Sequence, residues 1–141
     1  MRQYLVALLL LISLSACTDS YQQVLDKHDA VMVTHDEAMA KMDLIYDQIS
    51  SLRERQKQLN GGDSLSDPAS QTEILDAIVK LQHADDEMMD WMAEYAKPGE
   101  DAELEKSLAY LESEKGKIEV VAKQIDEALE QGEMVLEKSK E

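Results

Sequence analysis

From Tyr21 to Leu52, apolar and semi-polar residues recur in steps of three and four, which places them on one face of a helix. Such a repeat is a heptad seam, and it requires the helix to pack against other helices. The seam ends at Asn60-Gly61-Gly62, because Asn and Gly accept the left-handed backbone conformation that ends helices. The positions of this first seam are 21, 25, 28, 32, 35, 39, 42, 46, 49 and 52.

A second helical segment begins after a polar linker, at residues 68–73. Pro68 suits the first turn of a helix, where the missing N–H group is not needed. The sequence Ser70-Gln71-Thr72-Glu73 has the spacing of a capping box. The seam that follows consists of Leu75, Ile78, Leu81, Asp85, Met88, Met92 and Tyr95. The sequence Lys97-Pro98-Gly99 is expected to end this helix.

A third segment begins at Asp101, which is expected to cap its first turn. Its seam consists of Leu104, Leu108, Leu111, Lys115, Ile118, Val121 or Ala122, Ile125, Leu129 and Leu136. Gly116 and Gly132 lie inside this segment, and each lowers helix propensity by about 1 kcal/mol relative to Ala. We therefore expect local bending, or the close approach of another helix, at these two glycines.

Together the three segments predict an all-α protein, and specifically an antiparallel up-down-up three-helix bundle with long helices. The helices are expected at about 19–59, 69–97 and 101–138. Short connections favour antiparallel neighbours, and the alternation of β-branched and polar residues typical of strands is missing from the sequence. A long coiled-coil dimer is the alternative architecture. Leftover apolar surface would also permit self-association of the bundle.

The first 17 residues have the pattern of a lipoprotein signal. Arg2 precedes an apolar run over residues 4–12, and Leu14-Ser15-Ala16-Cys17 is a lipobox. We expect residues 1–16 to be cleaved, leaving residues 17–141 as one domain with lipid on Cys17. The apolar run is too short for a permanent helix across a bilayer of roughly 30 Å. The expected location is the bacterial cell envelope, on the periplasmic face of the outer membrane, although display on the cell surface is an alternative.

The chain is strongly acidic, with a net charge of −16 from 14 Lys and Arg against 30 Asp and Glu. Cleavage after residue 16 removes one cation and no acid, so residues 17–141 carry −17. This charge repels phosphate backbones, and we expect no nucleic-acid partner. The lipid on Cys17 is then the expected membrane attachment. With one cysteine in the chain, an intramolecular disulfide is excluded.

Methionine and histidine residues gather in two places along the seams. His28, Met32, His35, Met39 and Met42 follow one stripe of the first segment, and Met88, Met89 and Met92 lie in the second. Pairing the two segments as a hairpin brings both methionine groups to one level of the bundle, and pairing the second and third places Tyr110 opposite position 88. The simplest interpretation is a core filled by Met, without a cofactor.

The alternative interpretation of this layer is a copper site. Thioether and imidazole groups are ligands suited to Cu(I), and export would bring the domain into contact with copper. The candidate ligands are His35, Met39, Met42, Met88 and Met92. A haem between Met and His is a further alternative, but the sequence has no Cys-x-x-Cys-His for its covalent attachment. No motif of a hydrolase, a phosphate-binding loop or a calcium loop is found, and we expect no enzymatic activity.

Two short sequences carry a resemblance to a known family. The sequence over residues 35–42, His-Asp-Glu-Ala-Met-Ala-Lys-Met, and the sequence over 88–92, Met-Met-Asp-Trp-Met, are similar to the paired signatures of small Bacteroidota lipoproteins that are often labelled "viral A-type inclusion protein". The resemblance covers most of the chain and implies a lineage and a helical architecture, but no activity. The family's usual proline within the first signature is replaced by Ala40, which predicts an unbroken first helix. We therefore expect a non-enzymatic interaction or structural module.

Overall fold

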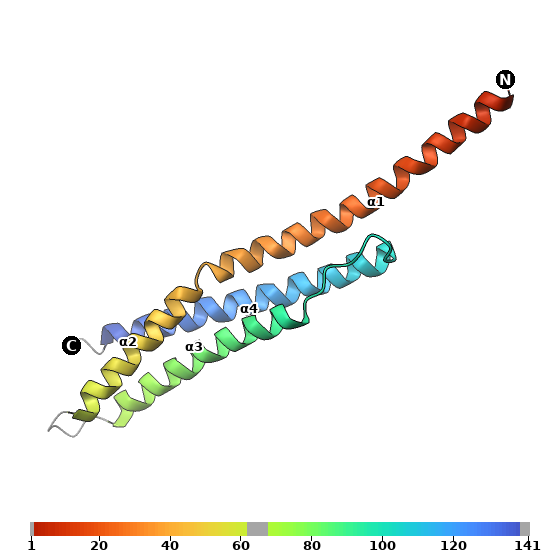
Figure 1. The fold of residues 1–141 in the computed structure, drawn as a ribbon. Coiled ribbons are helices and arrows are strands. Elements are labelled where there is room, and N and C mark those ends of the chain that lie inside the picture. The colour runs from red at the N-terminus through yellow and green to blue at the C-terminus, as the bar shows by residue number, and fades with distance from the viewer. Residues whose placement is uncertain (1, 62–67, 139–141) are drawn as a thin grey trace.

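The structure is a computed structural model that describes the backbone of residues 2–61 and 68–138 and the side chains of 20–61 and 68–138. Four helices make up nearly all of the described chain, and none of its residues lies in a strand. The helices are α1 (Arg2–Met39), α2 (Met42–Gly61), α3 (Pro68–Glu94) and α4 (Leu104–Lys138) (Figure 1). The expected all-α class is confirmed. The expected ends at 59, 97 and 101 differ from the observed ends by two or three residues.

The first predicted helix is broken at Ala40 and Lys41, so the prediction of an unbroken helix is wrong. The N–H of Lys41 donates to the carbonyl of Ala38 at 3.0 Å, a bond one residue shorter than that of an α-helix. Figure 1 shows α2 leaving α1 at an angle. The packing explains this break, because α1 lies against α4 whereas α2 lies against both α3 and α4. Tertiary contacts here override the high helix propensity of Ala40.

The core is a set of heptad positions from all four helices. In α1 and α2, Val24, Val31, Ala38, Ile45 and Leu52 follow one another at intervals of seven residues, and each is buried. The remaining buried apolar residues are Met42, Ile49, Ile74, Ala77, Ile78, Leu81, Ala84, Met88, Trp91, Leu111, Ile118, Val121, Ile125 and Ala128. This regular alternation is the side-chain pattern of left-handed helix packing.

The predicted seams were displaced by about one residue in places. Tyr46 and Leu75 were expected to face the core, but they are 51% and 47% exposed. Ile45 and Ile74, each one residue earlier, are buried instead, and the small residues Ala77 and Ala84 are buried as well. At 45/46 and 74/75 two large side chains are adjacent, and periodicity alone does not decide which of them is buried. Ala77 and Ala84, by contrast, carry little hydrophobic signal.

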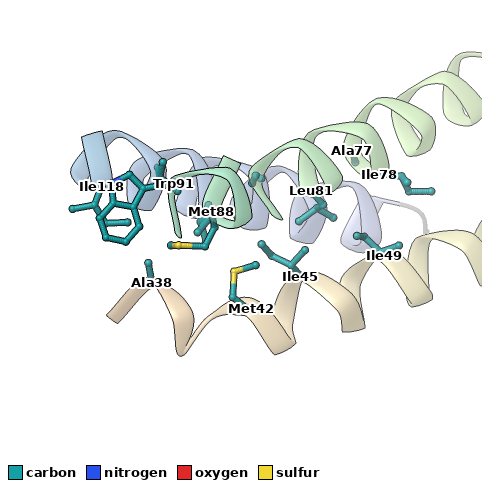
Figure 2. Packing of buried hydrophobic residues seen from close by; sticks show 14 of the residues in the cluster. Ala38, Met42, Ile45, Ile49, Ala77, Ile78, Leu81, Met88, Trp91 and Ile118 are labelled. Atoms are coloured by element: carbon teal, nitrogen blue, oxygen red, sulfur yellow. The ribbon is translucent and has the colours of Figure 1, made fainter. Parts of the chain in front are cut away.

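The register between α3 and α4 also differs from expectation. Tyr110 was predicted to lie opposite position 88, but its hydroxyl accepts a hydrogen bond from the N–H of Ala96 at 2.9 Å. The prediction assumed a tight turn between residues 97 and 101, whereas the connection occupies residues 95–103. The longer connection shifts α4 along α3 by several turns, and Ile118 lies near Trp91 instead (Figure 2). Among the described helices, none has the length and apolarity needed to cross a membrane.

Candidate functional site: the methionine and histidine layer

The layer is centred on two methionines in the core. Met42 begins α2 and is 4% exposed, and Met88 lies in the last third of α3 and is fully buried. Figure 2 shows their side chains pointing toward one another, with Ala38 beside them. Two of the predicted ligands thus come together in the core, where their thioethers pack among aliphatic side chains.

The other methionines lie at the edge of this core. Met39 and Met92 are partly buried and pack against it, whereas Met89 is 53% exposed. The five predicted ligands therefore occupy different environments. Met42 and Met88 have apolar surroundings, and the rest of the set reaches the surface.

His35 is held by contacts within the bundle. Its Nδ1 atom lies 2.8 Å from a carboxylate oxygen of Asp36. Its ring lies 5.6 Å from the ring of Trp91, at an angle of 34°. The contact with Trp91 comes from an element far away in sequence, so His35 fixes α1 against α3 as a packing residue. One of its two ring nitrogens has a partner in the structure.

His28 makes a second contact between α1 and the end of α3. Its Nδ1 atom lies 2.7 Å from the hydroxyl of Tyr95, and the two rings stack at 6.0 Å. Burial lowers the pKa of His28 from its usual value, Lys97 lowers it further, and Asp29 acts against both. His28 is therefore expected to be neutral at pH 7.

Tyr95 joins these contacts into a continuous row of rings. It stacks on Trp91 at 4.9 Å, so His28, Tyr95, Trp91 and His35 form one aromatic row. Burial, with Tyr110 and Glu114 nearby, raises the pKa of Tyr95 to about 12. Sequence analysis did not find this row. Its available signals were the spacing of four between Trp91 and Tyr95 and of seven between the histidines.

No group of three or more His, Cys, Asp or Glu residues within the described part of the chain is arranged to hold a metal ion. His83 lies apart from the layer, on an exposed surface, 3.6 Å from a carboxylate oxygen of Glu87. The side chain of Cys17, the predicted lipid attachment, lies outside the described residues. Of the predicted copper ligands, Met42 and Met88 are the two whose side chains lie next to one another in the core.

A groove of about 550 Å³ lies between α3 and α4 beside this layer. Glu87, Asp90, Trp91 and Glu94 line it from α3, and Gly116 and Lys117 are among its residues from α4. Lys117 is paired with Glu114, a carboxylate that is only 3% exposed. This ion pair raises the pKa of Lys117. The groove thus combines an indole ring with carboxylates on one wall.

Comparison of the chain with models of protein families, with curated proteins and with solved structures finds no match.

Proposed function

We propose that the chain is a lipid-anchored protein of the bacterial cell envelope whose helical bundle acts as a non-enzymatic interaction module. The observation that carries this proposal is the short distance in sequence between the lipobox and the core. Val24 is the first buried residue described, and six residues separate it from Cys17. A lipid on Cys17 would hold the bundle directly at the membrane, without a long flexible linker.

The proposed arrangement of the bundle is up-down-up, with α1 and α2 together as its first leg. Two ion pairs join this leg to α4, Lys27 with Glu112 and Lys41 with Asp126, and both span 85 residues. An equal separation supports a parallel course for these two legs.

Contacts of the second leg, α3, support the opposite direction. Tyr46 donates to Asp85 at 2.8 Å, and Gln71 donates to Asn60 at 3.1 Å. From position 46 to position 60 of α2, the partner residue in α3 falls from 85 to 71, and such falling numbers are expected for antiparallel helices. A pair between Lys138 and Glu73, at 2.6 Å, supports the same relation between α3 and α4.

The proposed location is the periplasmic face of the outer membrane. Thr18 follows the lipid-bearing residue, and the first acid, Asp19, comes one position later. The proposed partners are the membrane, through lipid on Cys17, and a protein bound by the bundle. The large negative charge argues against nucleic acid as a partner.

Cu(I) binding is the second candidate function, and the facing side chains of Met42 and Met88 favour it. In this candidate the two thioethers would supply soft ligands, with His35, Met39 or Met92 completing the set after a side-chain rearrangement.

The lipid anchor is tested by labelling bacteria that express the chain with a radioactive fatty acid. We expect label on the unmodified chain and on a Thr18→Ala control, and none on Cys17→Ser, which has no thiol to modify. Fractionation should move Cys17→Ser out of the lipidated membrane fraction, either as soluble protein or as uncleaved precursor. Label that persists on Cys17→Ser would overturn the proposal.

A further inference from the structure

Trp91, which lines the groove between α3 and α4, carries a buried hydrogen-bond donor without a partner among the described residues. Trp91 lines the groove and is 6% exposed, and its Nε1 atom has no acceptor among the described residues. Buried indole N–H groups ordinarily have a hydrogen-bond partner. Trp91 is therefore the residue of the groove wall whose polar group no described residue satisfies.

The opposite wall of the groove is open at Gly116. A Cβ atom built there would meet nothing within 4 Å, whereas at Gly132 it would collide with neighbouring side chains. Packing therefore explains the glycine at 132 but not the one at 116, where Ala would favour the helix more strongly. An open glycine on a groove wall permits another backbone to approach closely.

Carboxylates form the rim on the α3 side. Glu87, Asp90 and Glu94 follow one another at helical spacing, and all three line the groove. Lys117 lines the opposite side, but its charge is balanced by Glu114, at 2.8 Å. The rim therefore carries three carboxylates over the eight residues from 87 to 94, a rise of about 10 Å, and Lys117 is the cation that faces them and interacts with Glu94. A single small amine would be too short to meet all three carboxylates.

We propose that this groove is the docking site for a basic polypeptide segment of a partner protein. Lys or Arg side chains of the segment pair with Glu87, Asp90 and Glu94, and its backbone lies over Gly116. The inference rests on the proposed function as an interaction module and names the chemistry of the partner. Charge complementarity carries the choice of occupant, because the rim needs several cations at regular intervals.

The test uses the full chain with Cys17→Ser, purified in a nonionic detergent. Trp91 is the only tryptophan, so its fluorescence reports on the groove directly. The probe is an alanine-lysine helical peptide of about 16 residues, with lysines spaced to match the rim. A second peptide of the same composition, with its lysines clustered at one end, is the control for general charge attraction.

We expect saturable quenching or a shift of Trp91 emission with the matched peptide. Asp90→Asn and Glu94→Gln should each weaken binding about two- to fivefold. Gly116→Leu should weaken it about tenfold or more by filling the groove, while circular dichroism shows the helices intact. Glu130→Gln, an exposed acid of α4 that does not line the groove, is the matched control and should change binding less than about twofold.

Three results would overturn the proposal. One is a titration without any change in Trp91 emission, and another is unchanged affinity of Gly116→Leu. The third is self-association of the chain that is lost on Gly116→Leu, since this would identify a second copy of the chain as the occupant. None of these results depends on lipid at Cys17, so failure of the docking proposal and failure of the anchor are separable.

Discussion

Gly132 of α4 faces the side chain of Gln48 in α2 so closely that a Cβ atom at 132 would overlap Oε1 of Gln48 and lie 3.3 Å from Leu81 Cδ1. The Gln48 amide is held in place because its Nε2 atom donates to the carbonyl of Leu129 at 3.2 Å. A larger residue at 132 would therefore have to displace the Gln48 side chain, and the hydrogen bond to Leu129 opposes that displacement. The expectation of a close helix approach at Gly132 is confirmed.

Gly132→Ala should lower the free energy of unfolding by about 1–2 kcal/mol, because overlap with Gln48 outweighs the gain in helix propensity. Gln48→Ala alone should cost about 1 kcal/mol through its lost hydrogen bond. The double variant should lose less free energy of unfolding than the two single variants lose together. This is because Ala at 132 no longer overlaps a glutamine once Gln48 has been replaced. Urea denaturation measures this cycle, and strictly additive losses would contradict the explanation.

Gly116→Ala is the matched substitution at an open position. It should raise the free energy of unfolding by about 0.5–1 kcal/mol, because Ala restricts the unfolded chain and meets no obstacle in the folded one. The same denaturation measurement applies. A loss of stability comparable to that of Gly132→Ala would show that the two glycines share one role.

Glu114 of α4 is a buried carboxylate. One of its oxygens accepts a hydrogen bond from Lys117, and the other has no partner among the described residues. Glu114→Leu should leave stability unchanged or raise it by about 1 kcal/mol, because it removes a buried charge while Lys117 reaches water. Glu130→Leu, at an exposed position of the same helix, is the control for the general effect of removing an acid. A loss above about 2 kcal/mol for Glu114→Leu would mean that the ion pair is a net stabilising contact.

Replacement of Met42 and Met88 by Leu separates the two candidate functions. Leu keeps the hydrophobic volume, so each change should alter stability by less than about 1.5 kcal/mol. If the layer binds Cu(I), affinity should collapse while the fold persists, and competition with a Cu(I) chelator under reducing conditions measures it. Absence of binding tighter than micromolar by the unmodified chain would eliminate the copper candidate.

The pH dependence of stability should carry a contribution from His28. Because its pKa is lowered on folding, the unfolded chain binds this proton more readily, and stability falls as the pH drops through about 6.5. His28→Gln should remove that part of the slope between about pH 7 and 5. His83→Gln, at an exposed position, serves as the control. Identical slopes for the unmodified chain and His28→Gln would contradict the assignment.

The positions where helices end and begin were the most predictable part of the fold. Gly61 ends α2 and Pro68 begins α3, as the composition of these positions indicated. Their effects are local, since backbone freedom and the missing N–H group act within one helical turn. The break at Ala40, by contrast, depends on which helices α1 and α2 pack against, and no residue at the break signals it.

The sequence predicted which residues belong to the methionine and histidine layer, but it predicted only some of the contacts between them. Met42 and Met88 meet because the first connection was paired nearly correctly, and the error in the second displaced Tyr110. The rings of His28 and Tyr95 come together from elements far apart in sequence, which periodicity alone does not specify. Contacts of this kind follow from the register between helices, which is set by the packing of the whole core.

With lipid on Cys17, the tilted contact of His35 with Trp91 would also set the height of the groove above the membrane. His35 lies 18 residues after Cys17 on the same helix, which corresponds to about 27 Å of rise. With lipid on Cys17 and α1 upright, a segment that docks beside Trp91 would be confined to a layer within this distance of the bilayer surface. The partner should then itself be tethered to that membrane or embedded in it, and a flexible insertion between residues 17 and 24 would relax this selection without altering the groove.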